Sequence, residues 1–319
     1  IEKYGAESGM AAVMDPKTGE ILAMASLPDF DPTAFAKFEG RLYKNPFISD
    51  TYEPGSTFKP LIMAKALDDG LITPTTQCPI CDKPVQIGDY DIHTWNDKYT
   101  RNVTMTDVMI HSDNTGMVFI AQKMGLDKML DTLHVFGIGG ATGIDLEGEL
   151  APSFKDKDSW YPIDVATTSF GQGISVTAIE LLDAFSSIAN KGVRMRPYVV
   201  KNIITADGVE YPTEPKILSR PLSEETAKVM TEILVHAVNK GEAQWAKLKG
   251  FRIAGKTGTA SIPVDGHYDK TKTIASFIGF APADDPKFVM VVILNKPQTS
   301  IYGAETAAPI FFDIARDIL

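Results

Sequence analysis

The chain has 319 residues and a formal net charge of −10, with 44 % hydrophobic and 23 % charged residues. This is enough for one large hydrophobic core, or for a core with a smaller lobe. No cluster of lysine and arginine forms the basic stripe that phosphate binding needs, so we expect no nucleic-acid partner. The apolar stretches, such as 288–294, are too short to span a bilayer and predict buried strands.

The two ends of the chain predict strands. The apolar runs 10–14 and 21–25 flank the turn signal Asp-Pro-Lys-Thr-Gly-Glu, a pattern typical of an antiparallel hairpin. Near the C-terminus, three runs predict successive strands and one predicts a closing helix. These four segments are 251–260, 273–280, 287–294 and 307–319.

The middle of the chain predicts helices joined by two loop-like regions, 26–55 and 73–102. The expected helices are 56–69 with Gly70 as its C-cap, 106–125 with an interruption at 112–114, 127–136, 177–189 and 223–239. We therefore predict one domain over 1–319 with a mixed α/β fold in three layers, αβα. An antiparallel sheet of about five strands, from 8–26 and 250–319, is flanked by helices, with a helical subdomain over about 56–240.

A serine and a lysine three residues apart stand where a helix is predicted to begin. In Ser56-Thr57-Phe58-Lys59 the first and last side chains lie one turn apart on one helical face. A serine hydroxyl needs a base to become a nucleophile, and a buried lysine with a lowered pKa is such a base. N–H groups at a helix N-terminus can also stabilise an oxyanion. So short a pattern is usually a surface coincidence, but it occurs once in the chain.

The tripeptide Ser112-Asp113-Asn114 interrupts a predicted helix. Taken alone, it indicates a helix cap or a turn, because all three residue types favour both. A functional interpretation therefore depends on the other motifs with which it occurs.

A third pattern, Lys256-Thr257-Gly258-Thr259, lies in a predicted strand. Strand alternation puts Lys256 and Gly258 on one face, where lysine supplies positive charge and glycine leaves room for a substrate backbone. A second Lys-Thr-Gly, at 17–19, lies in the hairpin turn before Ser56, and we interpret it as structural.

Together and in this order, the three patterns are the signature of penicillin-binding proteins and class A β-lactamases. Tyr-Glu-Pro-Gly-Ser-Thr-Phe-Lys-Pro at 52–60 resembles the nucleophile segment of class B penicillin-binding proteins, and 9–32 resembles their opening hairpin. Phe-Gly-Gln-Gly at 170–173 resembles a segment that borders their active site. The resemblance runs from about Gly9 to the last helix. The chain is identified as a member of this family and is most similar to its elongation or division transpeptidases.

This resemblance implies the serine β-lactamase/transpeptidase-like fold and a D,D-transpeptidase that cross-links peptidoglycan stem peptides. Ser56 would form an acyl-enzyme with the stem peptide and would also be acylated by β-lactams. Lys59 would be the base. Ser112 would bridge Lys59 and Lys256 and pass a proton to the leaving D-alanine nitrogen.

The resemblance also implies how the substrate is held. Asn114 would bond the substrate's backbone amide, and Lys256 with Thr257 and Thr259 would attract its terminal carboxylate. The N–H groups of Ser56 and Thr259 would form the oxyanion hole. Further expected binding residues are Gly258, Gly171, Gln172 and Gly173. Asp113 is expected to be structural, and no metal or organic cofactor is needed.

Three other functions use similar residues. Class A β-lactamases add a glutamate in an E-x-x-L-N pattern, and Glu147 to Ala151 is a near match in which alanine replaces the asparagine. A D-alanyl-D-alanine carboxypeptidase uses water as the acceptor, and a β-lactam sensor is acylated without turning over wall substrate. The extended resemblance to class B proteins favours the transpeptidase.

The two cysteines, Cys78 and Cys81, form a single C-x-x-C. It is compatible with a redox pair, half of a zinc site with His93 as the nearest third ligand, or a loop disulfide. The missing fourth ligand favours a structural loop. The five histidines, at 93, 111, 134, 236 and 267, lack a metal-binding spacing, and we expect none to be catalytic.

The resemblance finally implies a location and partners. It places the domain at the extracytoplasmic face of the bacterial cell membrane, behind an N-terminal membrane anchor and a non-catalytic pedestal that these residues do not contain. It also implies a glycosyltransferase partner. Outside the cytosol, Cys78 and Cys81 can be oxidised.

Overall fold

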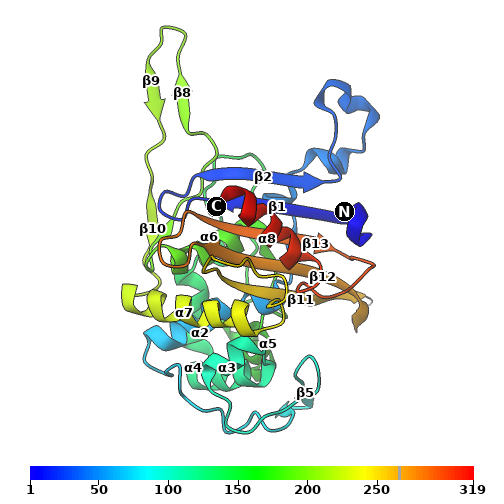
Figure 1. The fold of residues 1–319 in the computed structure, drawn as a ribbon, viewed down its shortest axis with the longest axis vertical. Helices are drawn as coiled ribbons and strands as arrows, with labels where there is room; N and C mark the ends of the chain where they lie inside the picture. Colours follow the sequence, from blue (N-terminus) through cyan, green and yellow to red (C-terminus); the bar gives the residue numbers. More distant parts are fainter. Residues whose placement is uncertain (265–266) are drawn as a thin grey trace.

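The structure is a computed structural model and describes residues 1–264 and 267–319 (Figure 1). Its strands are β1 Ser8–Met14, β2 Ile21–Leu27, β3 Thr51–Tyr52, β4 Val85–Ile87, β5 Tyr90–Ile92, β6 Val176–Thr177, β7 Arg194–Met195, β8 Asn202–Ile204, β9 Glu210–Pro212, β10 Ile217–Ser219, β11 Ala254–Val264, β12 His267–Ala281 and β13 Phe288–Asn295. Its α-helices are α1 Pro46–Ser49, α2 Lys59–Asp68, α3 Met105–Ile110, α4 Asn114–Val135, α5 Pro162–Thr168, α6 Ala178–Ala189, α7 Glu224–Lys240 and α8 Ala307–Ile318.

A five-stranded sheet with the order β11-β12-β13-β1-β2 forms the centre of the molecule (Figure 1). All of its neighbouring strands are antiparallel, and β1 pairs with β13 so that Ala11 lies opposite Val292. The N-terminal hairpin thus completes a sheet whose other strands come from the end of the chain. The predicted antiparallel sheet built from both ends of the chain is confirmed.

Both faces of this sheet are covered, because side chains alternate between two cores along each strand. On β13, Val289 and Val291 face the larger core, which α6 also lines. Met290 and Val292 face the other core, where they join Phe311 of α8. The helix α8 lies on one face of the sheet and α6 on the other (Figure 1). The predicted αβα layering is confirmed.

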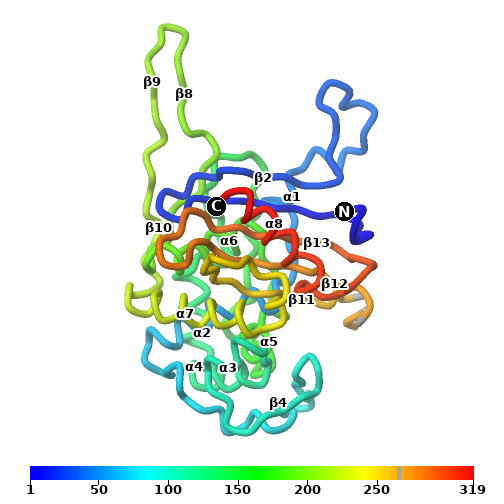
Figure 2. Tube along the Cα trace, viewed as in Figure 1, coloured from blue at the N-terminus to red at the C-terminus, as the bar shows by residue number. Residues whose placement is uncertain are grey.

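The helices α2, α3, α4 and α5 form a helical region below the sheet (Figure 2). The interruption predicted at 112–114 is confirmed, because α3 ends at Ile110 and α4 begins at Asn114. The helix predicted at 127–136 instead continues α4 across a kink at Gly125. None of the helices in the two described ranges is long and apolar enough to cross a membrane.

Several boundaries differ from the predictions. The expected helix at 56 begins only at Lys59, and Ser56 lies in a preceding 3-10 turn. Short elements occur in regions predicted as loop: α1 and β3 within 26–55, and the β4–β5 hairpin within 73–102. The β8–β9 hairpin, which projects from the body in Figures 1 and 2, was not predicted. Strands of two or three residues are too short to show a hydrophobic period.

Cys78 and Cys81 form a disulfide, and both are fully buried. The zinc interpretation is therefore wrong, because each sulfur is bonded to the other. Over the described ranges, no group of three or more His, Cys, Asp and Glu side chains is placed to hold a metal ion.

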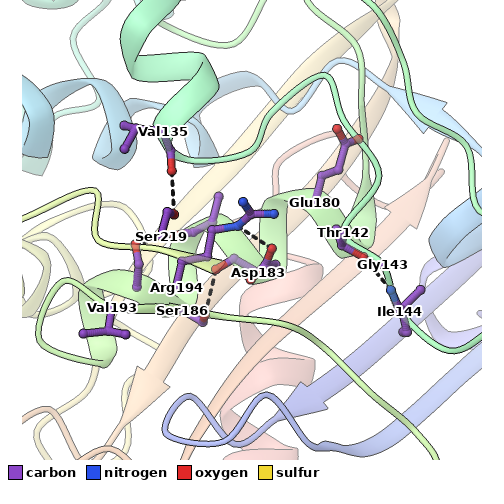
Figure 3. Close-up of polar contacts among 12 residues, drawn as sticks. Val135, Thr142, Gly143, Ile144, Glu180, Asp183, Ser186, Val193, Arg194 and Ser219 are labelled. Atoms are coloured by element: carbon purple, nitrogen blue, oxygen red, sulfur yellow. Dashed lines mark hydrogen bonds and ion pairs between the residues drawn. The ribbon is translucent and has the colours of Figure 1, made fainter. Parts of the chain in front are cut away.

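A buried ion pair joins α6 to β7 (Figure 3). The Nε of Arg194 donates to Oδ2 of Asp183 at 2.6 Å, and Asp183 is fully buried. Burial raises the pKa of Asp183 to about 7, although the charge of Arg194 opposes this shift. Gly137 makes room for the pair, since a Cβ there would lie 2.0 Å from the Arg194 guanidinium. The pair fixes the strand that follows α6.

We predict that Arg194→Met alone costs about 3–5 kcal/mol of unfolding free energy, because it leaves Asp183 buried without its charge partner. The double variant Asp183→Leu with Arg194→Met should recover most of that loss, since no unpaired charge remains. Denaturant unfolding of the three proteins measures both values. Equal losses in the single and double variants would contradict the assignment to an unpaired charge.

Candidate active site

The segment that carries Ser56 is positioned by two glycines. Gly55 has a φ of +56° and its N–H donates to the carbonyl of Gly171 at 2.9 Å. Gly171 has a φ of +77°, and a Cβ at that position would lie 2.2 Å from the Gly55 oxygen. Only glycine allows the two backbones to approach this closely. Gly171 therefore backs the 3-10 turn in which Ser56 lies.

Residues 171–173 hold the same segment at a second point. The N–H of Gly173 donates to Oε1 of Glu53 at 3.1 Å, and the hydroxyl of Tyr268 donates to both oxygens of this carboxylate. The N–H of Gln172 donates within the turn, to the Thr167 carbonyl at 3.0 Å. The segment that was expected to border the active site thus lies against the nucleophile segment and supports it. The expected role of Gly171, Gln172 and Gly173 in substrate binding stays a prediction.

A hydrogen-bonded chain links Ser56 to Lys59 through Ser112. The Ser112 hydroxyl donates to Oγ of Ser56 at 2.9 Å, and Nζ of Lys59 lies 3.3 Å from Oγ of Ser112. Ser112 has a φ of +55°, a conformation that costs free energy in a residue other than glycine and that often marks functional sites. The structure thus brings together a nucleophile candidate, a hydroxyl and an amine from two segments that lie far apart in the sequence, 56–59 and 112–114.

Lys59 is fully buried. Besides Ser112 Oγ, its Nζ donates to the Ser112 carbonyl at 2.6 Å and to Oδ1 of Asn114 at 2.8 Å. Burial and then the charge of Lys256 hold the pKa of Lys59 well below its usual value, while Asp113 and Glu242 act in the opposite direction. Burial disfavours an ammonium that lacks a paired carboxylate, so it shifts the equilibrium of Lys59 toward the neutral amine.

Lys256 is also buried, with 3 % of its surface exposed. Burial lowers its pKa, and the charge of Glu242 opposes that shift. Its Nζ donates to the carbonyl of Thr257 at 3.1 Å and to the hydroxyl of Thr257 at 3.2 Å. Ser112 was expected to bridge the two lysines, but the hydrogen bonds observed join it to Lys59 and Ser56. In the described part of the chain, its bridge to Lys256 is not formed.

The other expected binding residues already have partners within the protein. The amide of Asn114 accepts from Lys59 and donates to the His93 carbonyl at 2.9 Å. Oγ1 of Thr259 accepts from the N–H of Gly303 at 3.0 Å. Because a hydroxyl has one proton and two lone pairs, Thr259 keeps its proton for a further acceptor.

Gly258 makes room for the protein rather than for a substrate. A Cβ at Gly258 would lie 2.3 Å from Oγ of Ser276 and 2.8 Å from Cγ2 of Thr57. The space that we had assigned to a substrate backbone is therefore filled by β12 and by the nucleophile segment. The glycine allows β11 and the Ser56 turn to pack directly together.

Asp113 has the structural role expected of it. It is the N-cap of α4, and its Oδ1 accepts from the N–H of Thr115 at 2.7 Å and from that of Gly116 at 3.3 Å. This cap fixes the start of α4 and with it the positions of Ser112 and Asn114 on either side.

Some residues near the site were not found from the sequence. The hydroxyl of Thr257 donates to Oε2 of Glu242 at 3.2 Å. The rings of Trp95 and Tyr302 meet edge to face at 5.9 Å, and Nε1 of Trp95 donates to the His111 carbonyl just before Ser112. Glu242, Trp95 and Tyr302 belong to no motif, and no spacing in the sequence indicates that these side chains lie near the site.

A cavity of about 970 Å³ lies elsewhere, beside the β2 edge of the sheet. Met10, Met24, Tyr43 and Ile274 are among the residues that line it, and no residue of the three motifs does. The chemistry described above therefore does not belong to this cavity.

Comparison with known proteins supports the motif assignment at the level of the family. The family described as the penicillin binding protein transpeptidase domain matches residues 9–316. This chain belongs to that family. Stage V sporulation protein D of Bacillus subtilis is 37 % identical over 99 % of this chain and 50 % of its own length. Peptidoglycan D,D-transpeptidase FtsI of Escherichia coli is 34 % identical over 98 % of this chain and 51 % of its own length. The chain thus spans about half the length of these relatives.

Solved structures show the same fold. Penicillin binding protein 3 of Mycobacterium tuberculosis, in complex with aztreonam, has a TM-score of 0.91 and 32 % identity over 99 % of this chain and 73 % of that one. The transpeptidase domain of penicillin-binding protein 3 from Burkholderia pseudomallei has a TM-score of 0.86 and 29 % identity over 100 % of this chain and 89 % of that one.

We predict that Asp113→Ala lowers the unfolding free energy by about 0.5–2 kcal/mol, because two N–H groups at the start of α4 lose their acceptor. Asp113→Asn should lose much less, since asparagine caps helices about as well as aspartate. Denaturant unfolding of both variants measures the difference. Indistinguishable stabilities for the two variants would show that the cap is not what Asp113 contributes.

Proposed function

We propose that this chain is a serine-type peptidoglycan D,D-transpeptidase domain, which cross-links stem peptides through an acyl-enzyme on Ser56. The observation that carries this proposal is the hydrogen-bonded chain from Ser56 through Ser112 to the buried amine of Lys59. Membership of the transpeptidase-domain family and similarity to peptidoglycan D,D-transpeptidase FtsI support it.

In the proposed mechanism, Lys59 receives the proton of Ser56. A neutral amine has two N–H donors and one lone pair. The two short contacts of Lys59, to the Ser112 carbonyl and to Asn114, use both donors, which leaves the lone pair toward the Ser112 hydroxyl. Rotation of two hydroxyls then lets Ser56 donate to Ser112 while Ser112 donates to Lys59. Ser56 Oγ attacks the carbonyl of the penultimate D-alanine as its proton moves along this chain.

The donor peptide ends in a carboxylate, and we assign it to the β11 side of the site. Lys256 supplies positive charge there, and the free proton of the Thr259 hydroxyl is available to the carboxylate. The N–H groups of Ser56 and Thr259 would hold the oxyanion, an effect typically worth about 3 kcal/mol per donor. Asn114 retains one N–H and a lone pair beyond its observed bonds, which suits a substrate amide.

The second half of the reaction reverses the proton transfer. The protonated Lys59 returns its proton through Ser112 to the nitrogen of the departing D-alanine as the peptide bond breaks. An amine from a second stem peptide then attacks the acyl-enzyme. Its proton passes through Lys59 and Ser112 to Oγ of Ser56, which leaves as the free hydroxyl. β-Lactams would enter by the same first step and remain attached.

A β-lactamase is the second candidate, and the surroundings of Glu147 argue against it. Such an enzyme needs a carboxylate directed at a deacylating water, and Glu147 is the glutamate of the near match. Glu147 is exposed on the 142–149 loop. Glu149 closes this loop by accepting from the N–H of Thr142 at 2.7 Å and from that of Gly143 at 3.1 Å. Ala151 replaces the asparagine of the β-lactamase pattern.

Two parts of the proposal concern the whole protein, namely its location and its partner. Cross-linking takes place where stem peptides are, so we place the domain at the extracytoplasmic face of the bacterial cell membrane. A glycosyltransferase that makes the glycan strands is the partner class that this reaction requires.

We predict that incubation with benzylpenicillin adds one drug mass to the protein and that Ser56→Ala abolishes the adduct. Intact-mass spectrometry followed over hours measures both the formation and the lifetime of the adduct. A persistent adduct supports the transpeptidase. Fast loss of the adduct with drug hydrolysis would favour the β-lactamase, and an adduct on Ser56→Ala would refute the assigned nucleophile.

We further predict that Lys59→Arg slows acylation by roughly 10²–10⁴-fold, because a guanidinium cannot be deprotonated and the general base is lost. Lys65→Arg, six residues further along α2 in a half-buried ion pair with Asp69, should leave the rate unchanged. Stopped-flow or quenched acylation kinetics compare the two variants. Wild-type kinetics in Lys59→Arg would exclude lysine as the base.

A further inference from the structure

Glu242 lies behind the two lysines and makes contacts that no motif anticipates. It follows α7 directly and reaches β11, where Oε2 accepts from the Thr257 hydroxyl at 3.2 Å. Its Oε1 is buried and has no hydrogen-bond partner among the described residues. A carboxylate with one unpaired buried oxygen is costly to place in a protein, so its presence beside two buried lysines needs a cause.

The contacts form a directed chain. Nζ of Lys256 donates to the hydroxyl of Thr257 at 3.2 Å, and that hydroxyl donates to Glu242. Because a hydroxyl has a single proton, its donation to Glu242 turns its lone pairs toward Lys256. Glu242 thereby fixes the orientation in which Thr257 accepts from the ammonium group.

Glu242 lines a space too small for a substrate. Together with Lys256, Thr257 and Phe277 it lines a cavity of about 10 Å³, which is no larger than one water molecule. Ala237 and Ala243 help to close this space on the side of α7. The carboxylate therefore acts on the site through Lys256 and Thr257.

The geometry points to Glu242 as a positioning residue that keeps Lys256 charged and oriented for the donor carboxylate, by way of Thr257. This inference rests on the proposed transpeptidase function and adds a residue that sets its pH range. The other described charges that act on the two lysines are Asp113, at the start of α4, and the lysines themselves.

The direction of the pH effect follows from the charge of Glu242. Its field raises the pKa of Lys256 against the effect of burial, and it is the last of the influences that raise the pKa of Lys59. Lys256 must be charged, so its pKa sets the alkaline limb of the acylation rate. Lys59 must be neutral, so its pKa sets the acid limb. Loss of the Glu242 charge moves both limbs to lower pH, and the alkaline limb moves further.

The test is the pH dependence of acylation by benzylpenicillin in wild type, Glu242→Gln and Glu242→Asp. Glutamine keeps the size and an oxygen that accepts from Thr257, so it removes the charge while retaining the hydrogen bond. We expect the alkaline limb of the Glu242→Gln pH–rate profile to move to lower pH. For each pH unit of this shift, the acylation rate at high pH should fall roughly tenfold. Aspartate keeps the charge and should keep the wild-type alkaline limb even if its maximal rate falls.

Glu225→Gln, an exposed carboxylate in the first turn of α7, is the matched control and should leave the whole profile unchanged. A wild-type profile in Glu242→Gln would overturn the inference, and so would equal shifts in Glu242→Gln and Glu242→Asp. Thermal unfolding shows whether Glu242→Gln folds. If it does not, the inference is tested on Glu242→Asp alone. A displaced alkaline limb of its pH–rate profile overturns the inference, and a wild-type alkaline limb supports it. Absence of any adduct on wild type would instead refute the proposed function, and the inference with it.

Discussion

The burial of Lys59 beside Lys256 is the constraint on which the site depends. An ammonium group removed from water is unfavourable unless carboxylates compensate it, and here Lys59 has no paired carboxylate at hydrogen-bond distance in the described chain. Burial and the charge of Lys256 lower the pKa of Lys59, and Asp113 and Glu242 limit that shift. This balance gives one lysine the properties of a base while the other can still act as a cation.

Glycines let the segments around the two lysines pack closely. Gly55 and Gly171 let the nucleophile turn lie against the 171–173 segment, and Gly258 lets β11 pack on the same turn. The sheet made from both ends of the chain brings β11 next to α7 and to the 3-10 turn that carries Ser56. Small residues thus allow these backbone segments to pack directly together.

Two kinds of feature could be predicted from the sequence: elements long enough to show a hydrophobic repeat, and motifs that occur in a fixed order along the chain. The five-stranded sheet and the long helices showed in the hydrophobic pattern, and Ser56, Lys59 and Ser112 showed in the order of the motifs. The partners of Ser112 and the contacts of Gly258 could not be predicted, because they depend on packing between segments far apart in sequence. Glu242 could not be found either, since a lone glutamate after a helix resembles any solvent-exposed residue.

The most direct test of the central claim is a titration of Lys59 by NMR, in protein labelled at its lysines and assigned with Lys59→Arg. We expect the pKa of the Lys59 amine to lie well below the ordinary lysine value of 10.5. A Lys59 signal that stays cationic up to the range of the exposed lysines would contradict it. In that case the proton of Ser56 would have to be taken by another group.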